Sequence, residues 1–186
     1  MIKRVLTRIQ CMRYKIKYEN DLFIHPLSVI NARKGNCLLG REARLSAMTR
    51  IDCSANGVVK LGMHSILNTG SRIEADKSVI LGKHVAIAPY VYISDRNHEY
   101  RDISKPIIRQ GYFSRGGIQI GDETWIGIHT SVIGAVKIGR HCVIGANSVV
   151  TSDIPDYSVA VGNPARVVKK YNLEKKQWES VNEDIN

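Results

Sequence analysis

A histidine flanked by two carboxylates is the strongest candidate for chemistry in this sequence. Asp95, His98 and Glu99 stand within five residues of one another, in a polar segment at 94–117. A neutral histidine whose tautomer is fixed by a nearby carboxylate can act as a general base and take a proton from a hydroxyl. A lone loop histidine is more often a solvated side chain, and the spacing does not choose between Asp95 and Glu99 as the group that orients the ring.

An 18-residue repeat predicts the framework that must position this segment. Read in sixes from Ile120, the sequence gives IGDETW, IGIHTS, VIGAVK, IGRHCV and IGANSV, each opened by an aliphatic residue and continued mostly by small or turn-forming ones. Equivalent starts at Leu39, Leu61, Leu81 and Ile120 are 22, 20 and 39 residues apart, which is 18 plus 4, 2 and 21. Three sixes describe a triangular coil of three short strands with inward aliphatic side chains, and stacked coils pair in parallel.

The repeat also sets the expected domain organisation of an all-β protein. Residues 39–155 form the β-helix with its loop at 94–117, residues 1–38 a basic amphipathic segment and cap, and residues 156–186 a strand or helix cap. We expect an N-terminal helix, because apolar residues recur there every three or four positions, and a short helix after Pro164. The N-terminal helix either caps the first coil or lies on an anionic membrane surface. An ordinary β-sandwich is the alternative, but it would lack the register of the repeat.

The composition is that of one globular domain. With 186 residues, 44% of them apolar and 24% charged, the chain is not disordered, collagenous or coiled-coil. No run approaches the ~20 apolar residues of a membrane span, and the first residues lack a signal-peptide core, so we expect a cytoplasmic protein. The cysteines fit no zinc, redox or disulfide spacing and are expected to be free thiols; they are Cys11, Cys37, Cys53 and Cys142.

A net charge of +10 indicates an anionic partner. Residues 1–20 carry six basic side chains against one acidic side chain. Because the basic residues are not interleaved with an aromatic platform and no recognition motif is present, we expect no nucleic-acid binding. CoA, membrane lipid or a lipid-linked sugar is the expected partner of this segment.

Three segments toward the C-terminus resemble a known family. The motif WIG at 125–127, the run IGANSVVTSDIP at 144–155 and VGNPAR at 161–166 resemble the maltose and galactoside O-acetyltransferase branch of the hexapeptide-repeat acyltransferases. The segment PIIRQG at 106–111 resembles most the O-acetyltransferases of polysaccharide and O-antigen biosynthesis. The resemblance spans about residues 61–168 and implies a left-handed parallel β-helix that transfers acetyl from acetyl-CoA directly to a sugar hydroxyl, with no metal.

The resemblance implies a role for individual residues. Family members are trimers that hold acetyl-CoA in a groove between neighbouring β-helices. In these proteins a loop histidine acts as the general base, and it aligns with His98. Trp125 falls at an active-site tryptophan, and Asn68 and Asp76 fall where relatives hold the acceptor sugar. The expected CoA track comprises Gly127, Gly145, Ala146, Thr151, Arg166 and Lys169. Small corner residues let backbone N–H groups approach a thioester oxyanion, and basic side chains suit CoA phosphates. The chain departs from many relatives at Ser152, where they have lysine.

Three other functions stay open. His64, His84 and His141 recur at the fourth position of their sixes, as a zinc hydrolase on this fold would require, but we expect them to point outward with no carboxylate recurring beside them. A non-catalytic β-helix subunit would need neither the histidine loop nor the CoA motifs. An N-acetyltransferase acting on a nucleotide-linked amino sugar would use His98 in the same way. We expect a homotrimer acting on a carbohydrate, with peripheral membrane contact as an open alternative.

Overall fold

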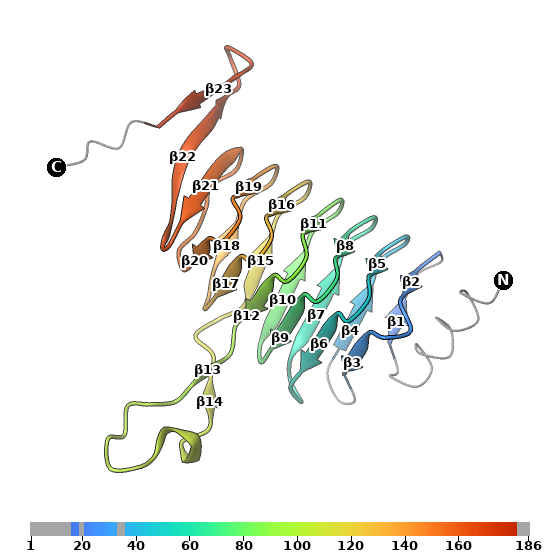
Figure 1. Ribbon diagram of the computed structural model, residues 1–186, viewed down its shortest axis with the longest axis vertical. Coiled ribbons are helices and arrows are strands. Elements are labelled where there is room, and N and C mark those ends of the chain that lie inside the picture. The colour runs from blue at the N-terminus through green and yellow to red at the C-terminus, as the bar shows by residue number, and fades with distance from the viewer. Residues whose placement is uncertain (1–15, 19–20, 33–35, 182–186) are drawn as a thin grey trace.

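Three parallel sheets wind around one triangular column in the computed structural model, which describes residues 16–18, 21–32 and 36–181 (Figure 1). We call them sheets A, B and C, and the corners between them AB, BC and CA. Sheet A comprises β1 (Lys17–Tyr18), β4 (Asn36–Leu39), β7 (Val58–Leu61), β10 (Ser78–Leu81), β15 (Ile118–Ile120) and β18 (Lys137–Ile138). The chain is thus the left-handed parallel β-helix that the resemblance implies.

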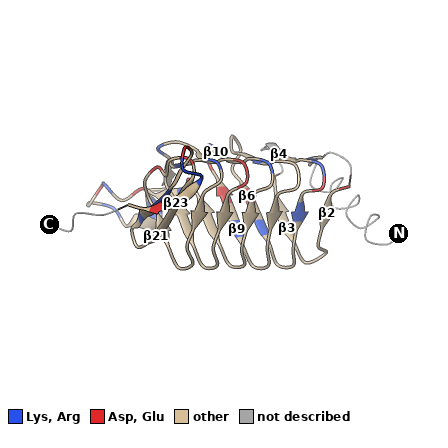
Figure 2. Ribbon diagram, turned by 90° about the horizontal axis from the view of Figure 1, so that it is seen from above, with Lys and Arg blue, Asp and Glu red and all other residues tan. Residues whose placement is uncertain are grey.

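The other two sheets follow the same stacking. The parallel strands of sheet B are β2 (Phe23–Ile24), β5 (Arg44–Leu45), β8 (Ile66–Leu67), β11 (Ala86–Ile87), β16 (Trp125–Ile126), β19 (Val143–Ile144) and β21 (Ser158–Gly162). Sheet C comprises β3 (Val29–Asn31), β6 (Arg50–Cys53), β9 (Arg72–Ala75), β12 (Tyr92–Ser94), β17 (Ser131–Ile133) and β20 (Val149–Val150). Seen from above, charged residues of both signs are interspersed along the coils (Figure 2).

Columns of aliphatic side chains fill the interior. On sheet A the column is in register from coil to coil and no member is more than 2% exposed: Leu39, Leu61, Leu81, Ile120 and Ile138. Each such side chain contributes roughly 1.5–3 kcal/mol by leaving water. These residues are the first of their six-residue blocks, so the sequence repeat places the aliphatic side chains of the core.

The corners are tight because neighbouring coils touch through their backbones. A Cβ added to Gly62 would lie 2.2 Å from the carbonyl oxygen of Gly82 in the next coil. One residue at each AB corner has a left-handed backbone, with φ between 51° and 63°: Asp21, Glu42, His64, His84, Glu123, His141 and Tyr157. Only small residues fit where coils stack this closely.

The ends of the column differ from the expectation. β1 to β3 pair in parallel with β4 to β6, so the sheets begin before residue 39. The expected N-terminal helix falls on residues 1–15, outside the described residues. The helix expected after Pro164 is wrong: β22 (Ala165–Asn172) and β23 (Gln177–Ser180) form an antiparallel hairpin on β21. Strands at this place pair the open edge of β21, and Val167 and Val168 favour them.

The long loop leaves the column at the CA corner, after β12, and returns at β15. Figure 1 shows it projecting away from the coils. It contains a two-stranded antiparallel ribbon of β13 (Asn97–His98) and β14 (Tyr112–Phe113), with the short 3₁₀ helix η1 (Ile107–Arg109) between them. The described residues include no helix long and apolar enough to cross a membrane.

Candidate active site

His98 lies on the loop ribbon against an aromatic ring. It pairs across the ribbon with Tyr112, and the two ring centroids are 4.5 Å apart at 45°. The guanidinium of Arg96 lies 5.2 Å from the centre of the Tyr112 ring. The imidazole is exposed, as a base that meets a substrate must be.

Asp95 is fully buried and binds backbone rather than the histidine. Its carboxylate oxygens accept hydrogen bonds from the backbone N–H groups of Asp76 (2.6 Å), Lys77 (2.8 Å) and Ser78 (2.8 Å). These bonds tie the start of the loop to the CA corner of the preceding coil. In the structure Asp95 therefore fixes where the loop leaves the column.

Glu99, the other carboxylate beside His98, forms an ion pair with Arg101. Its oxygens accept bonds from the Arg101 side chain and from the backbone N–H groups of Tyr100 and Arg101. The side-chain hydrogen bond from Arg101 lowers the pKa of Glu99 to about 2. Within the described part of the chain, no carboxylate is hydrogen-bonded to the ring of His98.

The two residues expected to hold the acceptor lie at opposite ends of β9. Asp76, at the CA corner, accepts two bonds from Arg96, from Nε at 2.9 Å and from a terminal nitrogen at 2.8 Å. Asn68, at the BC corner, donates its side-chain N–H to the carbonyl of Ile87 at 2.8 Å. Sequence reasoning missed Arg96 and Tyr112, because nothing in the repeat marks residues inside the excursion.

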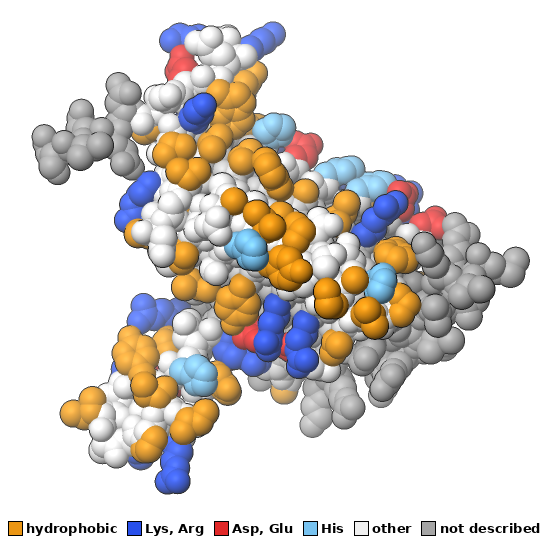
Figure 3. Space-filling model, viewed as in Figure 1, with side chains coloured by type: hydrophobic (Ala, Val, Ile, Leu, Met, Phe, Trp, Pro, Cys, Tyr) orange, Lys and Arg blue, Asp and Glu red, His pale blue; other side chains and the backbone are white. Residues whose placement is uncertain are grey.

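Three residues of the expected CoA track meet at the BC corner. Gly127 and Gly145 follow the paired strands β16 and β19, and a Cβ on Gly127 would lie 2.7 Å from the backbone nitrogen of Ala146. Beside this corner Met48, Tyr90 and Ile128 are exposed. Figure 3 shows hydrophobic side chains gathered over the central coils. Thr151 follows β20, at the next corner of the same coil.

A cleft of about 410 Å³ on sheet B brings Trp125 and Lys169 together. Its other lining residues are Glu123, His141, Cys142, Val143, Val159 and Trp178. Trp178 reaches the cleft from the C-terminal hairpin and packs edge-on against Tyr171. The tail was expected to be a helix, so the sequence did not place this second indole. Arg166 lies on the same hairpin, where its guanidinium donates to the carbonyl of Ala165.

The expected site residues fall into two groups on opposite sides of the column. Asp76, Asp95 and His98 lie at or beyond the CA corner, whereas Trp125 lies on sheet B, which is the face opposite that corner in a triangular coil (Figure 1). The BC-corner residues and Lys169 belong with Trp125. In this structure, one chain therefore does not bring all the expected site residues together.

The three histidines of the zinc alternative line the AB corner. The rings of His64 and His84 stack with centroids 4.9 Å apart, and His64 lies 3.2 Å from Glu42. His141 is likewise 3.2 Å from Glu123. The expectation that no carboxylate recurs beside them is wrong, because Glu42 and Glu123 occupy the same fourth position of their sixes. No group of three metal-ligating side chains occurs among the residues the structure describes.

Known proteins match the chain in sequence. Residues 117–152 match the family described as bacterial transferase hexapeptide (six repeats). WbbJ of Escherichia coli, named as a lipopolysaccharide biosynthesis O-acetyl transferase, is 34% identical over 151 residues, which cover 78% of this chain and 77% of WbbJ. A Mycobacterium tuberculosis protein named as an acetyltransferase is 43% identical over 122 residues. The match covers 66% of this chain, but the chain spans only 37% of that protein.

Solved structures share the fold. AntD, an N-acyltransferase from Bacillus cereus in complex with dTDP-4-amino-4,6-dideoxyglucose and coenzyme A, gives a TM-score of 0.75 at 14% identity, with 90% of each chain covered. A hexapeptide-repeat acetyltransferase from Vibrio cholerae, complexed with acetyl coenzyme A, gives 0.63 at 22% identity over 89% of this chain and 76% of that chain.

Proposed function

Since the chain belongs to the hexapeptide-repeat acetyltransferase family, we propose that it moves acetyl from acetyl-CoA to a sugar hydroxyl of a surface polysaccharide or its precursor. The observation that carries the acceptor class is the 34% identity to WbbJ over 77% of that protein's length. The exposed histidine on the loop ribbon supports the chemistry, because it offers a base outside the packed coils.

In the proposed reaction His98 takes the proton of the acceptor hydroxyl as its oxygen attacks the thioester carbonyl. The new C–O bond forms, the C–S bond breaks, and the imidazolium returns its proton to the departing CoA sulfur. The backbone N–H of Ala146 at the BC corner would stabilise the oxyanion, because the N–H groups of Gly127 and Gly145 already donate to the carbonyls of Ile144 and Ala160. Ala146, Thr151, Arg166 and Lys169 would line the CoA track, with Trp125 shaping the pocket. No metal is required by these steps.

The division of these residues over two sides of the column supports a homotrimeric enzyme. In a ring of copies, the loop of one copy would bring His98 to sheet B and the BC corner of its neighbour, where Trp125 and Gly127 lie. Each site would then consist of residues from two copies. Asp76, on the CA-corner side of one copy, and Asn68, at the BC corner of its neighbour, would hold the acceptor.

AntD favours a second candidate acceptor. It has the same fold and acts as an N-acyltransferase, and its structure contains an amino sugar on a nucleotide. An amine acceptor would need the same base, so His98 would serve either reaction. A panel containing both acceptor types distinguishes the two.

Location at the inner face of the membrane is part of the proposal, with the cytoplasm as the compartment. It is supported by the six basic side chains in residues 1–20 and the net charge of +10. Flotation with two kinds of vesicle tests it: anionic vesicles that contain phosphatidylglycerol, and neutral vesicles of phosphatidylcholine. Binding to the anionic vesicles alone would support membrane contact, and no binding to either would remove it.

The deciding experiment measures release of free CoA from acetyl-CoA by the wild type and His98→Ala, against mono- and oligosaccharides and nucleotide-linked amino sugars. We expect His98→Ala to bind acetyl-CoA normally in calorimetry and to lose at least ~100-fold in rate. His84→Ala is the matched control, since it removes an exposed histidine of the AB corner. Failure of the wild type to bind acetyl-CoA would overturn the proposal in favour of a non-catalytic β-helix subunit.

A further inference from the structure

We propose that Arg96 and Tyr112 are positioning residues that hold the imidazole of His98 for catalysis. This inference rests on the proposed function of His98 as the base. Neither nearby carboxylate orients His98, because Asp95 binds backbone and Glu99 binds Arg101. The guanidinium of Arg96 and the ring of Tyr112 then orient the imidazole, in place of a carboxylate.

The anchor of this arrangement is the pair of Arg96 and Asp76. Two N–H groups of the guanidinium converge on one carboxylate oxygen, at 2.9 and 2.8 Å. Both side chains are largely shielded, with 23% and 18% of their surface exposed. A charged hydrogen bond in such a place is stronger and better defined than an exposed one. Asp76 itself is held by its backbone N–H on Asp95.

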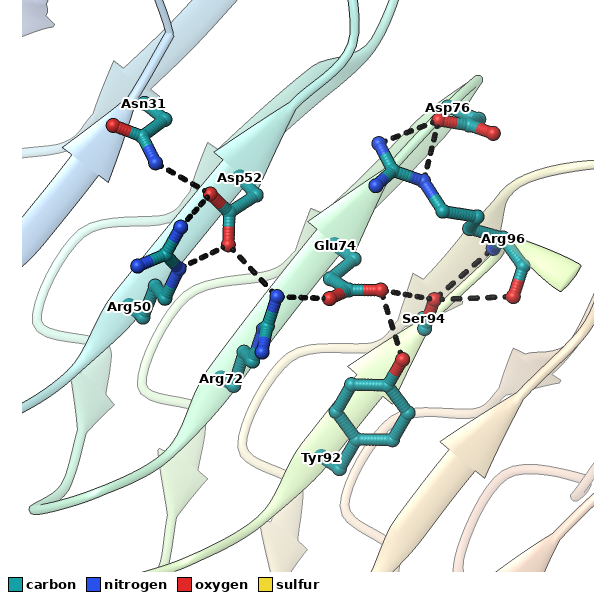
Figure 4. A network of polar contacts seen from close by, with 9 residues as sticks. All are labelled: Asn31, Arg50, Asp52, Arg72, Glu74, Asp76, Tyr92, Ser94 and Arg96. Carbon is teal, nitrogen blue, oxygen red and sulfur yellow. Dashed lines mark hydrogen bonds and ion pairs between the residues drawn. The ribbon is translucent and has the colours of Figure 1, made fainter. Parts of the chain in front are cut away.

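A polar network on the outer surface of sheet C extends the anchor (Figure 4). The backbone N–H of Arg96 donates to Ser94 Oγ at 3.1 Å, and Ser94 lies 3.4 Å from Glu74. Glu74 also accepts a bond from Tyr92 and pairs with Arg72. Arg72 also lies 3.3 Å from the carboxylate of Asp52 in the coil before. Side chains of three successive coils therefore support Arg96, the residue just before the ribbon.

From this anchor two contacts with the Tyr112 ring lead to the base. The Arg96 guanidinium lies 5.2 Å from the centre of the Tyr112 ring, within the range of a cation–π contact. Tyr112 faces His98 across the ribbon with ring centroids 4.5 Å apart. Directly opposed side chains in an antiparallel pair restrict each other. The plane of the imidazole is thus set by Tyr112, and the place of Tyr112 by Arg96.

The same loop contains a matched control. Arg101 also pairs with a carboxylate, Glu99, and also lies over an aromatic ring, that of Phe113 at 5.3 Å. Phe113 opposes Asn97 in the ribbon and not His98. Arg101→Ala removes an arginine, an ion pair and a ring contact from the loop without touching the proposed path to the base.

The test compares initial rates and unfolding temperatures of five loop variants with the wild type. Arg96→Ala and Tyr112→Leu should each lower kcat at least ~10-fold, because a small misplacement of a catalytic group is costly, while KM for acetyl-CoA stays within about twofold. Tyr112→Phe keeps the ring and Arg96→Lys keeps the cation, so both should retain most of the rate. Arg101→Ala should stay within about twofold of the wild type.

The outcomes separate the inference from the function on which it rests. If His98→Ala retains the wild-type rate, the base assignment fails. If His98→Ala loses its rate but Arg96→Ala and Arg101→Ala behave alike, or Tyr112→Phe falls with Tyr112→Leu, the positioning role is wrong. Should Arg96→Ala not fold, Tyr112→Leu against Tyr112→Phe decides the question, since neither alters the pair of Arg96 and Asp76.

Discussion

The hydrogen-bond partners of the Asp95 carboxylate decide its role in the structure. In the sequence Asp95 is one of two carboxylates, with Glu99, that could orient the ring of His98. Its side chain instead turns into the CA corner, where three backbone N–H groups would otherwise lie without acceptors. A buried donor without a partner costs more than a side-chain contact gains, so the backbone takes the carboxylate.

Replacing Asp95 with asparagine should destabilise the fold. The amide keeps one acceptor oxygen but turns an NH₂ toward N–H groups that need acceptors, which should cost about 2–3 kcal/mol. Urea unfolding followed by circular dichroism measures the change. Asp153→Asn is the control, because this exposed carboxylate accepts a single backbone bond, from Lys137 at 2.7 Å. Equal losses in the two variants would contradict this role of Asp95.

Asp52, in the network of sheet C, should make stability depend on pH. Burial raises the pKa of its carboxyl, but hydrogen bonds from Arg50 and Asn31 and the charge of Arg72 outweigh burial and hold that pKa below its usual 3.8. A pKa that is lower in the folded state stabilises the fold above the unfolded value, and this stabilisation is lost as the pH falls through the folded value.

We therefore expect Asp52→Asn to cost about 1 kcal/mol at pH 7 and clearly less at about pH 3. Urea unfolding of the wild type and the variant at the two pH values measures the difference. Glu174→Gln, in the turn of the C-terminal hairpin, should change little at either pH. A cost for Asp52→Asn that is the same at both values would show that shape, and not charge, explains the contribution of Asp52.

At the scale of elements, the spacing of the coils makes the corners intolerant of added atoms. Gly62→Ala would place a methyl group 2.2 Å from a backbone oxygen of the next coil, and backbone cannot turn aside as a flexible side chain can. We expect a loss of about 2 kcal/mol or more, and a melting temperature lower by roughly 4–8 °C. Calorimetry measures it, with Lys60→Ala, an exposed position of the same coil, as the control. Full stability of Gly62→Ala would mean that the coils can separate.

The elements also show where sequence reasoning succeeds and fails. The aliphatic positions of the sixes predict the core column, because each coil repeats one local solution. The C-terminal hairpin was not predicted, since its strands form to pair β21, an edge that exists only once the coils have stacked. The ribbon that faces His98 with Tyr112 pairs residues 14 positions apart inside a non-repeating loop. Neither the pairing of β21 with β22 nor that of β13 with β14 repeats along the chain, so no periodic pattern in the sequence predicts it.

At the scale of the whole molecule, the resemblance implies which residues are candidates for the site but not how one chain distributes them. It assigns His98 and Trp125 to one candidate site, whereas the two residues lie on opposite sides of the column. Sequence distance says nothing of this, because every coil visits all three sheets within about 18 residues. The division has a direct consequence if each site joins the loop of one copy to the groove of the next.

Two inactive variants should then restore each other. His98→Ala lacks the base, and Ala146→Trp fills the groove at an exposed BC corner, so neither homotrimer should acetylate an acceptor. In trimers reassembled at random from equal amounts of both, about one interface in four joins an intact loop to an intact groove. Mixed refolding should therefore recover about a quarter of the wild-type rate, whereas the two variants mixed without refolding should recover none. If refolded mixtures stay inactive although mass spectrometry shows mixed trimers, each site lies within one chain, and His98 must reach its own BC corner by a movement of the loop.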